Sequence, residues 1–86
     1  MNMKGQVALV SGAGSEQGIG MAIARRLGQA GARVLVTASS ARIEQRAAEL
    51  RQEGIEARAW VADLTDEQQV AELAAWAEAQ WGRVDI

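Results

Sequence analysis

Four glycines fall within nine residues near the start of this 86-residue chain, between an apolar run and a helical pattern. They are Gly12, Gly14, Gly18 and Gly20. The backbone N–H groups at a helix start have no intrahelical partners, and the helix dipole favours negative charge there. Glycine also lets phosphate oxygens approach the main chain, because it has no side chain. A strand, a glycine turn and a helix start in this order therefore predict a phosphate-binding site.

Small polar residues follow the second apolar run of the chain. Residues 38–42 read Ala-Ser-Ser-Ala-Arg, with no acidic residue among them. In a dinucleotide-binding fold, a carboxylate at this point accepts hydrogen bonds from the adenosine ribose and repels a 2′-phosphate. The hydroxyls of Ser39 and Ser40 and the guanidinium of Arg42 can instead donate to that phosphate. They favour NADP(H), with NAD(H) as the alternative. In a second interpretation the serines only cap a helix and Arg42 is solvated.

Composition limits the chemistry further. The chain has no cysteine, histidine or tyrosine, and Lys4 is its only lysine, so most of the usual general acids, bases and nucleophiles are absent. We identify no catalytic residue and no set of metal ligands, and we expect that the chain does not complete an active site by itself. The net charge of −2 and the scattered arginines argue against a nucleic-acid partner. With no apolar run long enough to span a bilayer and no signal-peptide pattern, we expect a cytoplasmic protein without a membrane partner.

Apolar runs and helical patterns alternate along the whole chain. We expect strands at Gln6–Ser11, Arg33–Thr37 and Ala57–Ala62, helices at Gly18–Ala30, Arg42–Glu53 and from a Thr65 cap to Trp81, and the start of a fourth strand at Val84–Ile86. Strands and helices that alternate with short connections build a parallel sheet with right-handed crossovers. The predicted fold class is α/β, a Rossmann-type doubly wound parallel sheet. This chain supplies its N-terminal βαβαβα portion and a truncated fourth strand.

The spacing of apolar residues predicts which side of each helix is buried. The expected core residues are Ile19, Ile23 and Leu27 in the first helix, Ile43, Ala47 and Leu50 in the second, and Val70, Leu73, Ala74, Ala77 and Trp81 in the third. The charged residues of the second helix, Arg46 among them, are predicted to form a solvated face. Thr65 and Gln68 have the spacing of a capping box, which would leave the carboxylate of Asp63 free for a ligand.

Three motifs resemble the first third of the short-chain dehydrogenase/reductase family. Ser11-Gly12 and Gly18-Ile19-Gly20 match the family turn Thr-Gly-x-x-x-Gly-Ile-Gly. Asp63-Leu64-Thr65 matches the end of the family's third strand, and Trp81–Ile86 matches the approach to its fourth. There are two departures, because Ser11 replaces a threonine and five residues, rather than three, separate Gly12 from Gly18. Gly18-Ile19-Gly20 is similar to the ketoreductase type of the family.

The resemblance implies where a cofactor would bind and what reaction would follow. The expected contacts to NADP(H), or to NAD(H), are Gly12, Ser15, Gln17, Gly18, Ile19, Gly20, Ser39, Ser40, Arg42, Asp63 and Leu64. Asp63 would accept a hydrogen bond from the adenine amino group, beside the backbone of Leu64. The reaction implied is hydride transfer between the nicotinamide and a carbonyl or alcohol, with a 3-oxoacyl thioester as the commonest substrate.

The family's catalytic serine and its Tyr-x-x-x-Lys have no match in this sequence. We therefore expect residues 1–86 to be the N-terminal part of a single NAD(P)-binding domain, inactive alone, from an enzyme that is a homo-oligomer. Two other hypotheses stay open: a stand-alone nucleotide-binding module without chemistry, and an interaction fragment that completes the sheet of another chain.

The edge of the first strand has a consequence for stability. In the family's strand order this strand lies between the second and the fourth strands. Only three residues of a fourth strand are present, so we expect most of the edge to be unpaired, and unpaired edges pair readily with other chains. We predict that the 86-residue chain is unstable or associated by itself.

Overall fold

The computed structural model of the protein describes residues 2–12 and 18–86. Its elements alternate in the order β1 (Val7–Ser11), α1 (Ile19–Gln29), β2 (Arg33–Ala38), α2 (Arg42–Gln52), β3 (Ala57–Val61) and α3 (Glu67–Trp81). This is the predicted order, and each element begins and ends within one residue of the predicted bounds. Gly31, Gly54 and Gly82 lie at the helix ends with positive φ, which only glycine adopts without strain.

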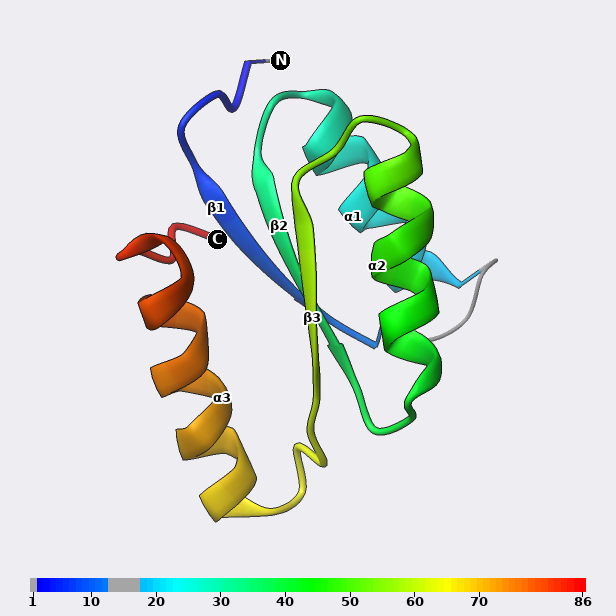
Figure 1. Ribbon diagram of the computed structural model, residues 1–86. Coiled ribbons are helices and arrows are strands. Elements are labelled where there is room, and N and C mark those ends of the chain that lie inside the picture. The colour runs from blue at the N-terminus through cyan, green and yellow to red at the C-terminus, as the bar shows by residue number, and fades with distance from the viewer. Residues whose placement is uncertain (1, 13–17) are drawn as a thin grey trace.

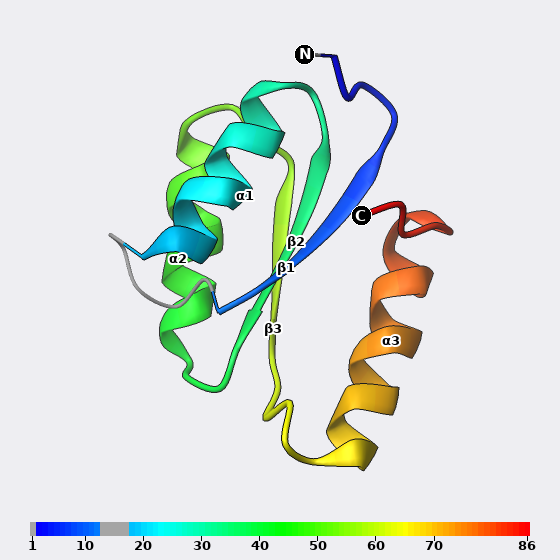
Figure 2. The same cartoon turned by 180° about the vertical axis from the view of Figure 1, so that it is seen from behind.

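The strands form one parallel sheet in the order β1-β2-β3. Leu9 pairs with Leu35, and Leu35 pairs with Arg58 on the other side. α1 and α2 cover one face of the sheet, and α3 lies on the opposite face (Figures 1 and 2). The central strand β2 is buried from Val34 to Thr37, as expected for a strand covered on both faces. The predicted doubly wound arrangement is confirmed.

The buried side of α1 is not the one that the apolar spacing predicted. Ile19 and Ile23, expected in the core, are 80% and 47% exposed, whereas Met21 and Ala24 are fully buried. Leu27 is partly buried and packs against the core, as predicted. The prediction for the two isoleucines was therefore wrong.

Two glycines explain how α1 lies on its neighbours. A Cβ built on Gly20 would lie 2.6 Å from the carbonyl oxygen of Gly12, and one built on Gly28 would lie 2.4 Å from Cγ2 of Ile55. The helix therefore makes its closest approaches along the side that carries these glycines and Met21. Counting apolar side chains overlooks such a side, because glycine contributes no side chain to the count.

The packing of α2 agrees with the prediction except at one residue. Ile43, Ala47 and Leu50 are fully buried, as expected. Arg46, predicted to lie on a solvated face, is only 7% exposed. One of its terminal nitrogens lies 2.9 Å from a carboxylate oxygen of Glu49, three residues further along the helix. Pairing with that carboxylate allows the guanidinium to be buried, because a buried charge is tolerated when it is paired.

α3 buries fewer of its predicted residues. Leu73 and Ala77 lie in the core, whereas Val70 and Ala74, also expected inside, are exposed. Trp81 is partly buried, in agreement with its predicted place on the core side. Of the helices that the structure describes, α3 alone covers this face of the sheet (Figure 2). A single narrow side of α3 makes the contact, and the residues beside that side stay in solvent.

Tryptophans fill the space between α3 and the edge strand β3. The rings of Trp60 and Trp76 are stacked with centroids 5.2 Å apart and planes at 29°. The guanidinium of Arg58 lies 4.5 Å from the ring centroid of Trp81, a cation–π distance. The sequence did not assign the side on which Trp60 lies, and the structure turns it towards α3.

The last residues of the chain return to the edge of β1. The backbone N–H of Asp85 donates to the carbonyl oxygen of Val7 at 2.8 Å, and the N–H of Leu9 donates to the carbonyl oxygen of Ile86 at 2.9 Å. The C-terminus accordingly lies beside β1 (Figure 1). β1 therefore lies between β2 and the C-terminal residues, as expected, but residues 83–86 form no strand and the sheet of the described residues has three strands.

Candidate functional site

A hollow of about 370 Å³ lies where the three strands end. Its lining residues follow β1, β2 and β3: Gly12, Ala38, Ser39, Ser40, Ala62, Asp63 and Leu64. In open parallel α/β sheets, ligands bind outside the carboxyl ends of the strands. Five of the residues predicted from the sequence are therefore brought together at one edge by segments that are far apart in the chain.

The glycine turn joins β1 to α1 at this edge. Gly12 has φ +68°, a left-handed conformation that favours glycine. Gly20 lies so close to Gly12 that no Cβ could fit between the helix and the end of β1. Gly18 is the N-cap of α1 and provides no side-chain hydrogen bond to the first turn. The N-terminus of α1 therefore has backbone donors without a side-chain cap, as an anion site requires.

Two further predicted contacts, Ser15 and Gln17, lie outside the described residues. Ile19, the first residue of α1, does not line the hollow. Instead it borders a separate apolar depression on the outer side of α1, together with Ala22, Ile23, Arg26 and Leu27. Gly12 therefore lines the hollow, and Gly20 packs against the backbone of Gly12. The side chain of Ile19 lies outside the hollow.

The end of β2 carries the polar groups that the sequence singled out. Ser39 and Ser40 both line the hollow and are exposed. The hydroxyl of Ser40 accepts a hydrogen bond from the backbone N–H of Arg42 at 3.2 Å. The N-cap of α2 is Ala41, which makes no side-chain cap. In the second interpretation the serines only cap the helix. The bond from Arg42 to Ser40 is the one contact among the described residues that agrees with such a role.

Arg42 begins α2 and is exposed at the same end of the sheet. Its guanidinium makes no ion pair with the part of the chain that the structure describes. Thr37 stands just before this turn and is buried, and its hydroxyl donates to the carbonyl oxygen of Trp60 at 2.7 Å. This bond ties the end of β2 to the end of β3. The turn that carries Ser39 and Ser40 therefore starts from a fixed position.

Asp63 follows β3, but its carboxylate is not left free as predicted. One oxygen, Oδ1, accepts from the hydroxyl of Thr65 at 2.7 Å and from the backbone N–H of Thr65 at 3.0 Å. The hydroxyl bond, followed by the backbone bond, lowers the pKa of the Asp63 carboxyl below its ordinary value. The carboxylate is thus held ionised at neutral pH, in an exposed position beside Leu64 at the rim of the hollow.

The N-cap of α3 is Asp66 and not Thr65. The Asp66 carboxylate accepts from the backbone N–H groups of Gln68 and Gln69 at 2.9 and 3.3 Å. The hydroxyl of Thr65 donates to Asp63 and is not the cap of the helix. A carboxylate one residue later takes the cap, and its charge also suits the positive end of the helix dipole.

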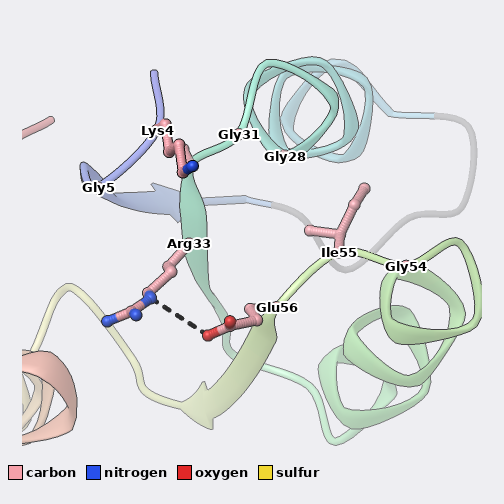
Figure 3. Close-up of a pocket in the computed structure, with 9 residues that line it drawn as sticks. Lys4, Gly5, Gly28, Gly31, Arg33, Gly54, Ile55 and Glu56 are labelled. Carbon is pink, nitrogen blue, oxygen red and sulfur yellow. Dashed lines mark ion pairs between the residues drawn. The ribbon is translucent and has the colours of Figure 1, made fainter. Parts of the chain in front are cut away.

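A second hollow lies at the opposite, amino edge of the sheet (Figure 3). Glycines line much of it, and Arg33 and Glu56 form an ion pair at its rim with N···O 3.2 Å. α1 and α2 end here at Gln29 and Gln52, and Gly31 and Gly54 follow them. The carboxyl ends of helices carry partial negative charge, so this edge disfavours a phosphate. The glycine turn, where the sequence predicts a phosphate site, lies at the other edge.

Sequence reasoning missed Ala38 and Ala62 as lining residues of the first hollow. Both follow strands at the same edge and have small side chains, which leave room for a ligand. Their positions immediately before Ser39 and Asp63 were the available indication.

The model of the short chain dehydrogenase family matches residues 6–86. The chain belongs to this family. The match covers the glycine turn, the end of β2 and Asp63, so the whole hollow falls inside the shared region.

Three relatives illustrate the similarity. A 2-dehydro-3-deoxy-D-gluconate 5-dehydrogenase from Formosa agariphila is 38% identical over 87 residues, which cover 99% of this chain and 32% of that protein. A hydroxysteroid dehydrogenase from Escherichia coli superposes with TM-score 0.92 at 36% identity, over 98% of this chain and 34% of the other. The actinorhodin polyketide ketoreductase, solved with NADPH, has TM-score 0.88 and 41% identity, over 93% of this chain and 30% of the other.

This chain therefore spans about a third of the length of these short chain dehydrogenases. The matched part is shared by proteins whose names refer to three different kinds of substrate. Within residues 2–12 and 18–86, no helix is long and apolar enough to cross a membrane.

Proposed function

We propose that residues 1–86 form the cofactor-binding part of an NADP(H)-dependent short-chain oxidoreductase. The observation that carries this proposal is the hollow at the carboxyl edge, where the end of β2 offers Ser39 and Ser40 and no carboxylate. Arg42 is exposed one turn further on. A 2′-phosphate needs donors and no carboxylate directly beside it, and the end of β2 meets both conditions.

The residues at this edge fit a dinucleotide. The volume of the hollow, about 370 Å³, lies in the lower part of the range found for small-ligand sites. In our proposal the glycine turn binds the pyrophosphate through Gly12, Ser15, Gln17, Gly18, Ile19 and Gly20. For Ile19 the contact would come from its backbone, since its side chain lies outside the hollow.

The adenosine half of the cofactor would lie across the ends of β2 and β3. Ser39, Ser40 and Arg42 would donate to the 2′-phosphate. Asp63 would accept from the adenine amino group, beside the backbone of Leu64. Its lowered pKa keeps it an acceptor at neutral pH, and the bonds from Thr65 occupy Oδ1, so the contact falls to the other carboxylate oxygen.

When bound, the nicotinamide supplies the hydride for interconversion of a carbonyl and an alcohol. The substrate class stays open between small carbonyl compounds and a 3-oxoacyl thioester, because the relatives with this first third act in differently named reactions. In our proposal residues 1–86 belong to a single NAD(P)-binding domain of a homo-oligomeric enzyme, and other residues of the enzyme supply the catalytic groups.

Calorimetric titration of the 86-residue chain with NADPH and with NADH tests the cofactor assignment. We expect tighter binding of NADPH, by about tenfold or more, since hydrogen bonds to charged groups contribute about 1.5–3 kcal/mol. Ala38→Asp should reverse the preference by adding a carboxylate beside the 2′-position. Arg42→Gln should weaken NADPH alone, and Arg26→Gln, on an exposed part of α1 away from the hollow, is the matched control. Equal affinities together with an unchanged preference in Ala38→Asp would contradict the proposal.

A second candidate is a nucleotide-binding module without chemistry, favoured by the lack of tyrosine, histidine and cysteine in these residues. The intact mass and the turnover of the natural gene product separate the two candidates. A mass near three times 9.1 kDa with NADPH-dependent carbonyl reduction supports the oxidoreductase. A mass of 9.1 kDa with NADPH binding and no turnover supports the module.

A further inference from the structure

The segment after α3 is fixed to the sheet before it reaches β1. Trp81 lies under two guanidinium groups, with Arg58 at 4.5 Å and Arg33 at 5.6 Å from its ring centroid. Gly82 then ends the helix with φ +77°, and its N–H donates to the carbonyl oxygen of Glu78 at 2.8 Å. The chain therefore turns sharply and comes to β1 at an angle, as the view of the C-terminus in Figure 1 shows.

In the first hydrogen bond between this segment and β1, the acceptor is a side chain. In a regular parallel ladder, a bond from Leu9 N–H to the carbonyl of Ile86 is preceded by one from Val7 N–H to the carbonyl of Val84. The bond from Leu9 is present at 2.9 Å. The N–H of Val7, however, donates to Oδ2 of Asp85 at 2.8 Å. The carboxylate of Asp85 thus occupies the place of the Val84 carbonyl.

Arg83 holds this carboxylate in position. Its Nη2 lies 2.6 Å from Oδ1 of Asp85 and its Nε lies 2.9 Å from Oδ2. Together with the backbone N–H of Val7, the guanidinium fixes both oxygens of the carboxylate. The backbone N–H of Asp85 also donates to the carbonyl oxygen of Val7 at 2.8 Å. Asp85 therefore contacts both backbone polar groups of a single residue of β1.

We propose that Asp85 is a positioning residue that sets the register of a fourth parallel strand on β1. The carboxylate of Asp85 satisfies the N–H of Val7, while Ile86 accepts from Leu9 and its own N–H donates to the carbonyl oxygen of Val7 at 3.2 Å. A slip by one residue would carry the carboxylate away from Val7 and turn every following side chain to the other face of the sheet. The unpaired N–H of Val7 would then be left at a partly buried position.

The register matters for the site because it determines what reaches the carboxyl edge. Ser11 is two residues beyond Leu9 on β1, and Gly12 of the hollow follows it. Because the N–H of Leu9 donates to Ile86, Leu9 pairs with the residue after Ile86, and a chain that continues in this register comes level with Ser11 three residues after Ile86. Asp85 would thus place the following residues beside the nicotinamide end of the cofactor, a consequence that rests on the proposed function.

Hydrogen–deuterium exchange read at single amides of the natural gene product that contains residues 1–86 tests the role of Asp85. In the unmodified chain we expect protection at Val7 and Leu9. Asp85→Ala should lower protection at both amides by at least tenfold. The amide of Val34, which bonds to the carbonyl of Glu56 in the next ladder at 2.8 Å, is the internal control and should stay protected.

Asp85→Asn keeps an acceptor oxygen and should restore protection at both amides, which a general loss of charge or packing would not do. The proposal is overturned if Leu9 stays protected in Asp85→Ala, or if Asp85→Asn loses as much protection as Asp85→Ala. If Val34 also loses protection, the alanine variant has unfolded and Asp85→Glu replaces it. Asp85→Glu keeps the charge and displaces the carboxylate by one methylene. The amide of Val7 should then lose protection while the amide of Val34 keeps it. Unchanged protection at Val7 would refute the proposal. All measurements are made without nucleotide, so a failure of NADPH binding leaves this result unaffected.

Discussion

Replacing Gly20 by alanine tests the close approach on which the glycine turn depends. In an exposed helix position, alanine is more favourable than glycine by about 1 kcal/mol. Helix propensity alone therefore predicts that Gly20→Ala stabilises the protein. The structure predicts the opposite sign. A Cβ at this position would meet the carbonyl oxygen of Gly12 at 2.6 Å, its carbonyl carbon at 2.8 Å and the carbonyl oxygen of Ser11 at 3.0 Å.

All three atoms belong to the backbone, so no side-chain rotation can remove the overlap. Relief requires that α1 moves away from β1 or that the turn deforms. Overpacking of this kind costs about 1–3 kcal/mol, and backbone neighbours place Gly20→Ala at the upper end. After subtraction of the gain in helix propensity, we expect a net loss of about 2 kcal/mol in the free energy of unfolding.

Urea unfolding followed by circular dichroism measures this free energy. Ala22→Gly, at an exposed position two residues further along α1, is the matched control. It should lose about 1 kcal/mol from helix propensity alone. A second readout is the affinity for NADPH, which Gly20→Ala should weaken because the displaced helix start carries the phosphate donors. The reasoning is refuted if Gly20→Ala unfolds at the same or a higher urea concentration than the unmodified chain.

Two further predictions concern packing and pH. Ile43→Ala, at a fully buried position, should lower the free energy of unfolding by about 2–5 kcal/mol. Ile23→Ala, on the exposed side of α1, should lower it by less than half as much. Equal losses in urea unfolding would mean that Ile23 is in the core, as the apolar spacing predicted. The hydrogen bond from Arg83 is the largest cause of the lowered pKa of the Asp85 carboxyl. The contribution of this carboxylate to stability is therefore complete above the ordinary carboxyl pKa of about 3.9, and it is lost as the pH falls through the lower pKa of the folded state. Stability measured from pH 7 to about 2 should therefore decline less steeply in Asp85→Asn than in the unmodified chain, and identical slopes would show that the carboxylate makes no such contribution.

Much of the fold follows from local patterns. The alternation of apolar runs with helical spacing, and the glycines at the helix ends, were sufficient to predict the order of all six elements and the parallel sheet. These features depend on backbone preferences and on burial along one strand or one helix, so neighbouring residues determine them. The hollow was also predictable in outline, because the carboxyl ends of parallel strands lie at one edge.

The helix faces were less predictable. The spacing of Ile19 and Ile23 indicated one side of α1, whereas the close approaches at Gly20 and Gly28 selected another. Arg46 was expected in solvent and is buried. For α1 the outcome depends on glycines, which add no side chain to a hydrophobic pattern, and for Arg46 it depends on an ion pair with Glu49 that lets a charged group be buried.

Competition between hydrogen-bond partners was likewise outside the reach of the sequence. Thr65 and Asp66 are both good helix caps, and in the structure Asp66 caps α3 while the hydroxyl of Thr65 donates to Asp63. Asp85 stood in a recognised motif, but its contact with Val7 spans 78 positions of the chain. The sequence by itself determined the elements, their order and the chemistry of the glycine turn, since these depend on residue type and short-range spacing. The tertiary structure decided which side chains are buried and which acceptor each donor takes, because those choices depend on distances between residues that only folding brings together.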